Sequence, residues 1–278
     1  MQALRLFLPN LPSIPNLGQG SSIGVSRPGK DLSTGLAEND QGDAVNALSG
    51  ERILIAWERG LSMPEPWRPL ALLELAMPET DIATLASMPL AERNAKLLEL
   101  RSISFGRAIE AFATCPLCDA PLEFVLNADD LRRNVCTAAE ETWIESKTEM
   151  HMRVANSNDL AAVVDSASED DACAMLLART MGIENTDVDF KAHSDWLTRF
   201  EHLNAVAETV CALTCEACAE RSEIDFDIAG FLWREVGAAA RRLLSEIHRL
   251  ASAYGWSERE IAAMNPARRN AYLEMLNS

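Results

Sequence analysis

Four of the seven cysteines form two Cys-x-x-Cys pairs, Cys115/Cys118 and Cys215/Cys218. The spacing within a pair lets both thiolates reach one metal ion, and two pairs supply the four sulfur ligands of a tetrahedral zinc site. Apolar and polar residues alternate soon after each pair, over residues 122–126 and 224–228, as expected for a strand. This order predicts a split zinc ribbon, in which two hairpin turns share one structural Zn2+ ion.

The two pairs are separated by 96 residues, far more than a simple ribbon needs. The extra chain must therefore form a helical insertion of its own. Other interpretations of the pairs are a thiol–disulfide redox centre, an iron–sulfur cluster and thiols that bind nothing. A redox centre would need a βαβ context that the pattern lacks, and it would leave the second pair unexplained. Four thiolates leave no open coordination position, so the predicted zinc site is structural.

The other residues that could carry chemistry form no pattern typical of an active site. Cys136, Cys173 and Cys211 are interpreted as small buried hydrophobic residues. Cys211 precedes Cys215 by four residues, so it is a more distant alternative ligand. The four histidines form no metalloprotease or catalytic-triad pattern, and the glycine motifs that bind phosphate are absent. The sequence therefore predicts a protein that is not an enzyme.

The net charge limits the partners that the chain can bind. The 278 residues include 42 acidic and 25 basic side chains, for a formal net charge of −17. This balance opposes binding to nucleic acid and to anionic membranes. No apolar run reaches the roughly 18–20 residues of a membrane-spanning helix, and the N-terminal residues lack a signal-peptide pattern. We expect a cytoplasmic protein, and in that compartment thiols stay reduced and cysteine pairs favour metal over disulfide.

Hydrophobic periodicity predicts an α+β fold that is mostly helical, with a small antiparallel ribbon. Four regions follow from it: a flexible arm over 1–45, a helical domain over 46–114, the split ribbon with its insertion over 115–228, and C-terminal helices over 229–278. The arm is rich in Gly, Ser, Pro and Asn, which bury little apolar surface. The helical pattern before the first cysteine pair runs up to residue 114, with an interruption at Gly106.

Within the third region the pattern changes between periods of two and of three to four residues. Strands are predicted over residues 122–126, 150–154 and 224–228, and helices over 159–164, 169–181 and 194–207. In the fourth region one helical face carries Ile228, Leu232, Val236, Ala240, Leu243, Ile247, Leu250 and Tyr254. Ser257 and Glu260 predict a capping box, with Trp256 packing on Ile261. Asn265 and Pro266 predict the start of a last helix.

Several stretches resemble one family in the same order along the chain. They are ERILIAWERG, RPLALLELAMPE, LLELRSISFG followed by CPLC, MRVANSNDLAAV, ACAMLLARTM, CEAC, FDIAGFLWREV and LASAYGWSEREIAAMNPARRNAYLEML. Together they cover roughly residues 50–278. The family is that of zinc-ribbon proteins from gene clusters of phage contractile tails and bacterial contractile injection systems. The last stretch also resembles tail-assembly chaperones. The family has arginine and proline where this chain has Val154, Ala155 and Asn156, and its members have no counterpart of the long arm.

The resemblance implies a structural or assembly component of a tail or injection-system baseplate, present in multiple copies. Its partners would be other tail or baseplate proteins, and it would be located in the cytoplasm during assembly or in the finished particle. Aromatic and arginine residues supply most interface hot spots, which favours Trp256, Arg268, Arg269 and Tyr272 as partner-binding residues. Packing within the chain is the alternative role of these four. Alternative functions are a transient assembly chaperone, a zinc-ribbon nucleic-acid adaptor and a thiol–disulfide enzyme.

Overall fold

The computed structural model describes residues 44–133, 140–145, 148–183 and 193–277. The arm predicted over residues 1–45 thus lies outside the described residues except for its last two, and so does Cys136. The described chain combines helices with small antiparallel sheets, each made of two strands. This confirms the expected α+β class.

The first helices form a body around one apolar core. Their bounds are α2 Glu51–Leu61, a 3-10 turn Glu65–Trp67, α3 Arg68–Ala76, α4 Ile82–Ser87 and α5 Leu90–Phe105. Leu70, Leu72 and Leu73 of α3 are fully buried in this core, together with Leu97 and Leu100 of α5. The carboxylate of Asp81 caps α4 by accepting hydrogen bonds from the N–H groups of its first turn.

The prediction of helix up to residue 114 is wrong beyond Gly106. Helix α5 ends at Phe105, and Gly106 has a φ of 96°, which favours glycine. Strand β1, Ala108–Thr114, follows and pairs antiparallel with β2, Pro121–Asn127. Ile109 and Phe112 are spaced as on one helical face, but Ile109 is fully buried and Phe112 is 73% exposed. The period of two residues in a strand places them on opposite faces.

The segment between β2 and the second cysteine pair is only partly helical. It contains α6 Ala128–Arg133, β3 Glu140–Glu145, β4 Thr148–Arg153, α7 Ser157–Val163, α8 Glu169–Met181, α9 Ser194–Asn204 and a 3-10 turn Ala205–Ala207. Strand β4 and helices α7, α8 and α9 confirm the elements predicted there. Strand β3 pairs with β4 and was not predicted. Trp196 and Phe200 of α9 pack with Leu176 of α8 in a second apolar core.

The chain returns to the body through a second hairpin. Strand β5, Val210–Thr214, pairs with β6, Arg221–Asp225. The strand predicted over 224–228 therefore ends at Asp225, and Ile228 begins the long helix α10, Ile228–Tyr254. The carboxylate of Asp227 caps this helix, which explains why the strand cannot continue.

Helix α10 contacts both the body and the last helices. The apolar face predicted for it is buried, apart from Tyr254, which is 38% exposed. Its first half packs on the body, where the ring of Trp233 lies against Gly60 of α2. Its second half packs on α11, Glu258–Ala262, and α12, Pro266–Met275. The capping box of Ser257 and Glu260 and the cap of Asn265 are confirmed.

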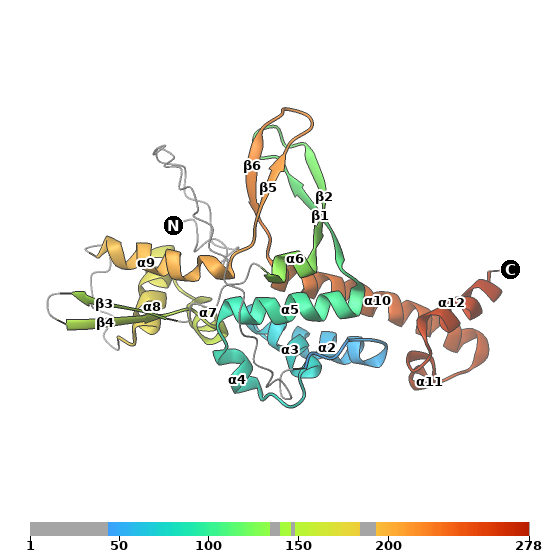
Figure 1. The fold of residues 1–278 in the computed structure, drawn as a ribbon. Helices are drawn as coiled ribbons and strands as arrows, with labels where there is room; N and C mark the ends of the chain where they lie inside the picture. Colours follow the sequence, from blue (N-terminus) through green and yellow to red (C-terminus); the bar gives the residue numbers. More distant parts are fainter. Residues whose placement is uncertain (1–43, 134–139, 146–147, 184–192, 278) are drawn as a thin grey trace, which may run out of the picture.

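Figure 1 shows the arrangement of these elements. The hairpins β1–β2 and β5–β6 rise next to each other from one side of the helical body. The β3–β4 hairpin lies with α8 and α9 at one end of the molecule, and α11 and α12 lie at the other. Among the described residues, none of the helices is both long and apolar enough to cross a membrane.

Candidate metal centre

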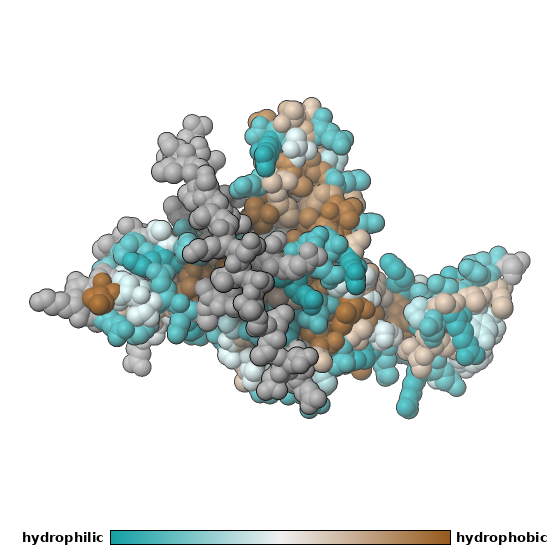
Figure 2. Space-filling view, in the orientation of Figure 1, coloured by the Kyte–Doolittle hydropathy of each residue, from teal (hydrophilic) through white to brown (hydrophobic). Residues whose placement is uncertain are grey.

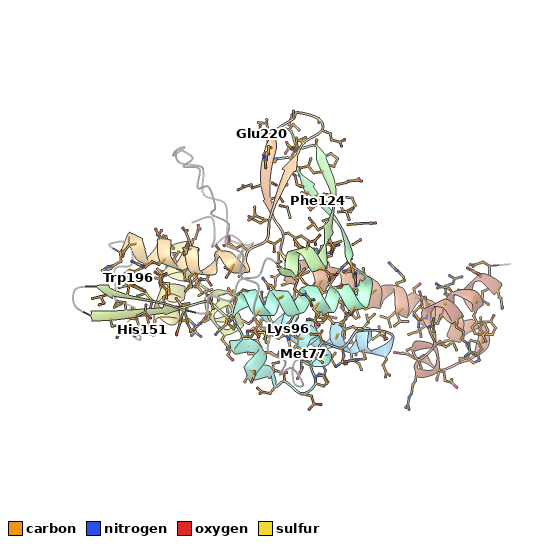
Figure 3. The ribbon with its side chains drawn as sticks, in the orientation of Figure 1. Met77, Lys96, Phe124, His151, Trp196 and Glu220 are labelled. Carbon is orange, nitrogen blue, oxygen red and sulfur yellow. The ribbon has the colours of Figure 1, made fainter. Side chains whose placement is uncertain are left out.

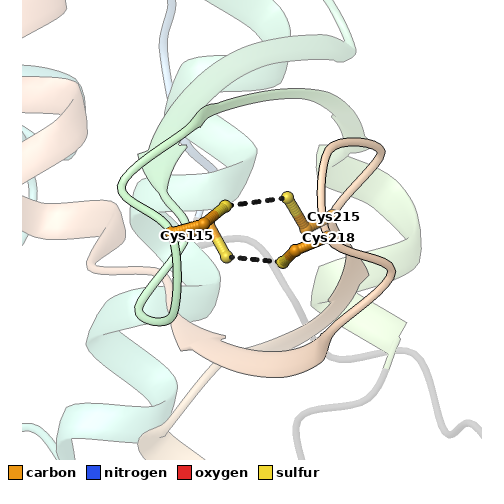
Figure 4. Close-up of side chains that lie close together, drawn as sticks. Cys115, Cys215 and Cys218 are labelled. Carbon is orange, nitrogen blue, oxygen red and sulfur yellow. Dashed lines mark hydrogen bonds between the residues drawn. The ribbon is translucent and has the colours of Figure 1, made fainter.

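The first cysteine pair forms the turn that joins β1 to β2. The N–H of Cys115 donates to the carbonyl of Ala120 at 2.9 Å, and the N–H of Asp119 donates to the carbonyl of Cys115 at 3.0 Å. Asp119 has a φ of 57°, in the left-handed region that lets the chain reverse directly after Cys118. These bonds direct both sulfurs to the same side of the turn (Figure 4).

The second pair repeats this geometry in the turn from β5 to β6. The N–H of Cys215 donates to the carbonyl of Glu220, and the N–H of Ala219 donates to the carbonyl of Cys215, both at 2.8 Å. Ala219 has a φ of 60°, matching Asp119 in the first turn. Among the described residues other than glycine, only these two have a positive φ. Both turns therefore adopt the same unfavourable backbone conformation, at the residue that follows the second cysteine of each pair.

The four sulfurs form one compact group. The Sγ atoms of Cys115 and Cys218 are 3.7 Å apart, and so are those of Cys118 and Cys215 (Figure 4). All four Sγ atoms lie within 4.8 Å of one another. A disulfide would need about 2.05 Å, whereas a tetrahedral zinc ion with Zn–S bonds of about 2.3 Å places its sulfurs about 3.8 Å apart. The arrangement has the dimensions of a metal site and not of a disulfide pair.

Backbone amides and neighbouring sulfurs set the pKa values of these thiols. Hydrogen bonds from the N–H of Cys218 and then of Ala217 lower the pKa of Cys215 to about 7. The N–H of Glu220 lowers the pKa of Cys218, but burial and the three other sulfurs outweigh it and raise this pKa to about 12. The thiol of Cys215 thus loses its proton readily. All four sulfurs can be negatively charged together only if a cation lies between them.

The two inner cysteines of the cluster pack with a small set of apolar residues. Cys115 and Cys215 are buried, and Cys118 and Cys218 are exposed. Leu122 is buried with the two inner cysteines, and few partly buried apolar residues surround them. So small a core contributes little to holding two hairpins together, and the sulfur cluster is the main link between their outer ends.

The other described cysteines lie outside the cluster. Cys211 is buried on β5 opposite Ile224, and burial followed by the charge of Asp225 raises the pKa of its thiol. Cys173 is half-buried on α8, and burial is the main cause that raises its pKa to about 11. Neither thiol is activated, which agrees with their interpretation as small apolar residues.

The residues predicted to bind a partner divide into two groups. The rings of Tyr254 and Trp256 are stacked 4.5 Å apart, and the ring of Tyr272 meets Trp256 edge-on at 4.8 Å. The exposed Arg268 guanidinium lies 5.8 Å from the centre of the Tyr272 ring. Arg269 differs, because its side chain is buried. Its Nε donates to Glu246 at 2.9 Å and its Nη1 donates to the carbonyl of Met264 at 2.6 Å.

Arg269 therefore stabilises the packing of α12 on α10. Its predicted role in binding a partner is corrected to packing within the chain. The sequence could not reveal this, because Glu246 lies 23 residues away on another helix. Trp256, Arg268 and Tyr272 keep part of their surface accessible.

A second polar cluster, which the sequence analysis did not single out, lies at the start of α7. The carboxylate of Asp159 is fully buried and accepts hydrogen bonds from Arg153 at 2.6 and 2.9 Å and from Arg179 at 3.0 Å. It also closes a capping box with Asn156. Every oxygen of Asp159 has a partner, so this cluster is structural. Figure 3 shows Trp196 and His151 at the end of the molecule that contains β3, β4, α8 and α9.

Fold and site together define a mixed α+β protein with a four-cysteine cluster that could hold a metal ion. No family model matches this chain, and neither a curated protein nor a solved structure is significantly similar to it.

Proposed function

We propose that the four cysteines bind one structural Zn2+ ion and that the two hairpins thereby form a split zinc ribbon. The observation that carries this proposal is the approach of all four sulfurs within 4.8 Å of one another, from turns with the same backbone geometry. Thiolates favour zinc over the hard cations, and a complete set of four sulfurs leaves no position for a substrate. The site is accordingly structural, and we assign no catalysis to it.

We further propose that the protein is a structural or assembly component of a contractile tail or injection-system baseplate. This role rests on the resemblance of residues 50–278 to that family, not on the metal site. The net charge of −17 favours protein partners over nucleic acid. Partial exposure of Trp256, Arg268 and Tyr272 supports a contact surface at the C-terminal end.

The metal proposal is tested by elemental analysis of the purified protein beside the Cys115→Ser variant. We expect about one zinc per chain in the parent. The variant is expected to lose the metal, because a serine hydroxyl does not replace a thiolate. Cys173→Ser is the matched control and should keep its zinc. A parent protein that is folded without metal contradicts the proposal, and iron with visible absorption would identify an iron–sulfur cluster instead.

The assembly proposal is tested by mass spectrometry of purified tail or injection-system particles from cells that express the chain. Its presence at a fixed ratio to baseplate proteins is expected of a structural component. Its absence from the particles, together with copurification with immature tail parts, would indicate a transient assembly chaperone. A salt-sensitive shift of DNA or RNA in a gel would instead support the nucleic-acid adaptor.

A further inference from the structure

The two hairpins enclose a groove next to the sulfur cluster. Its volume is about 630 Å³, and its walls come from β2 on one side and from β5 with the second cysteine turn on the other. Leu122 and Leu213 supply apolar surface within it, while the exposed carboxylates of Glu123 and Glu216 stand at its walls. The groove thus combines a mixed polar and apolar lining with negative charge, which suits a basic and partly apolar ligand.

The hairpin pair, residues 108–127 and 210–225, is strongly acidic as a whole. Its only basic side chain is Arg221. Its carboxylates are Glu110, Asp119, Glu123, Glu216, Glu220, Glu223 and Asp225. Figure 3 shows Glu220 at the outer end of the β5–β6 hairpin, far from the helical body.

Carboxylates at the base of this pair repel one another. Burial and then the charge of Glu223 raise the pKa of Asp225, and burial followed by the charge of Asp225 raises the pKa of Glu208. One oxygen of Glu208 also has no hydrogen-bond partner in the described part of the chain. In the part of the chain that the structure describes, none of the carboxylates of the hairpin pair forms an ion pair.

The C-terminal unit, residues 228–277, has more basic than acidic side chains. It carries seven arginines and five glutamates, whereas the residues before it carry 18 basic and 37 acidic side chains. Two of its glutamates are held in ion pairs, Glu235 with Arg101 and Glu246 with Arg269. Six exposed arginines form no ion pair with any described residue: Arg234, Arg241, Arg242, Arg249, Arg259 and Arg268.

Exposed apolar residues accompany the charged residues on both the hairpin pair and the C-terminal unit. On the hairpin pair, Phe112 is 73% exposed, and Leu117 and Val125 are also exposed; Figure 2 shows hydrophobic residues there between hydrophilic edges. On the C-terminal unit, Tyr254 and Met275 are exposed. Burying both surfaces would add hydrophobic stabilisation to the charge attraction.

We propose that the groove between the two hairpins is a docking site for the C-terminal unit of a second copy of this chain. The hairpin groove and the end of the C-terminal unit that carries α11 and α12 lie apart in one molecule (Figure 1), so each binds a neighbour. The groove and the C-terminal unit are different surfaces. When the groove of one copy binds the C-terminal unit of another, one groove and one C-terminal unit of the pair remain unoccupied. Such contacts extend into a ring or a filament and do not stop at a dimer. The inference is independent of the tail role.

The test is sedimentation velocity of the zinc-loaded full-length chain at several concentrations. Association beyond a dimer is expected at about 50 mM salt, with at least tenfold weakening at about 500 mM, because salt screens exposed charges. Two charge-reversal variants separate the surfaces. The groove variant carries Glu123→Lys and Glu216→Lys, and the arginine variant carries Arg241→Glu, Arg242→Glu and Arg268→Glu. Each alone should associate at least tenfold more weakly than the parent.

Mixing the two variants should restore association, since the unchanged arginines of one meet the unchanged groove of the other. The control variant, Glu79→Lys with Asp165→Lys, changes the net charge as much as the groove variant does but lies on other exposed positions, and it should associate like the parent. Zinc content and circular dichroism verify that every variant is folded. A parent that is monomeric in all conditions overturns the proposal, and so does unchanged association of both variants.

Discussion

The carboxylate of Asp159 is fully buried, yet it is charged because of its two arginine partners. Burial by itself would raise its pKa, but the hydrogen bonds and charge of Arg153, the N–H of Asn156 and the bond from Arg179 together hold the pKa below its usual range. A depressed pKa in the folded state means that the ionised form favours folding. This contribution to stability is present above the unfolded pKa and is lost as the pH falls through the folded pKa.

Replacing Asp159 by Asn should lower the free energy of unfolding at pH 7 by about 1.5–3 kcal/mol, because the charged hydrogen bonds from Arg153 and Arg179 are weakened. The loss is limited because the two arginine side chains are 39% and 40% exposed, so that water compensates part of their charge. The difference between parent and variant should shrink as the pH falls below 4. Urea unfolding at a series of pH values measures both effects. Asp165→Asn, at an exposed position, should change stability by less than about 0.5 kcal/mol. An equal loss in both variants would contradict the assigned role of the cluster.

Single residues also show what the sequence could and could not reveal. The cysteine spacing alone grouped the right four sulfurs, because each pair is local and its turn geometry is dictated by the neighbouring backbone. Arg268 and Arg269 were both predicted to bind a partner because arginine is frequent among interface hot spots. Only the packing of α12 on α10 distinguishes the two, and that packing is not local.

Among the elements, helices with local signals were predicted best. The capping box at Ser257 and the long apolar face of α10 lie within a few residues of the features they define. Strand β1 was taken for helix because Ile109 and Phe112 also fit a helical face. A strand is stabilised by its partner, and the register that pairs Ile109 with Leu126 involves residues 17 positions apart. The short strands β3 and β5 were missed for the same reason.

The contact of α10 with α2 depends on the absence of a side chain at Gly60. A Cβ there would lie 2.4 Å from the Trp233 ring. Gly60→Ala should therefore destabilise the protein by about 1–3 kcal/mol through overpacking. Gly237→Ala is the matched control, because its Cβ would meet its nearest atom at 3.4 Å, and alanine favours a helix by about 0.5–1 kcal/mol. Thermal unfolding should show opposite shifts in Tm; a gain in both variants would contradict the close contact.

The whole molecule joins a large helical core to hairpins with a very small one. The body buries leucines of α3 and α5 with Leu232 and Val236 of α10, and none of the four clustered cysteines belongs to that core. The hairpin pair is anchored at its base, where Ile109 and Ala111 of β1 belong to the body core, whereas its outer end depends on the sulfur cluster and on a few apolar residues. Stability is thus distributed unevenly over the fold.

Removing the proposed zinc ion with a chelator should accordingly affect the outer ends of the hairpins first. Amide hydrogen exchange in the parts of β1, β2, β5 and β6 next to the cysteine turns is expected to accelerate at least tenfold, while α3, α5 and the first half of α10 keep their protection. Hydrogen exchange measured by mass spectrometry, with and without chelator, tests this. The Cys115→Ser variant should match the chelated parent. Uniform acceleration over the whole chain would show that the helical body also depends on the metal.

The two cysteine pairs leave the ribosome at different times. The sulfurs that meet are 97 and 103 residues apart in the chain, which corresponds to about 5–20 s of synthesis at typical rates. During that interval Cys115 and Cys118 lack their partners, although β1 and β2 can already pair. The helices and the β3–β4 hairpin between the pairs are synthesised before the second turn. Closure of the sulfur cluster is thus a late event in the biogenesis of the protein, because it requires that residues 115–218 have all been made.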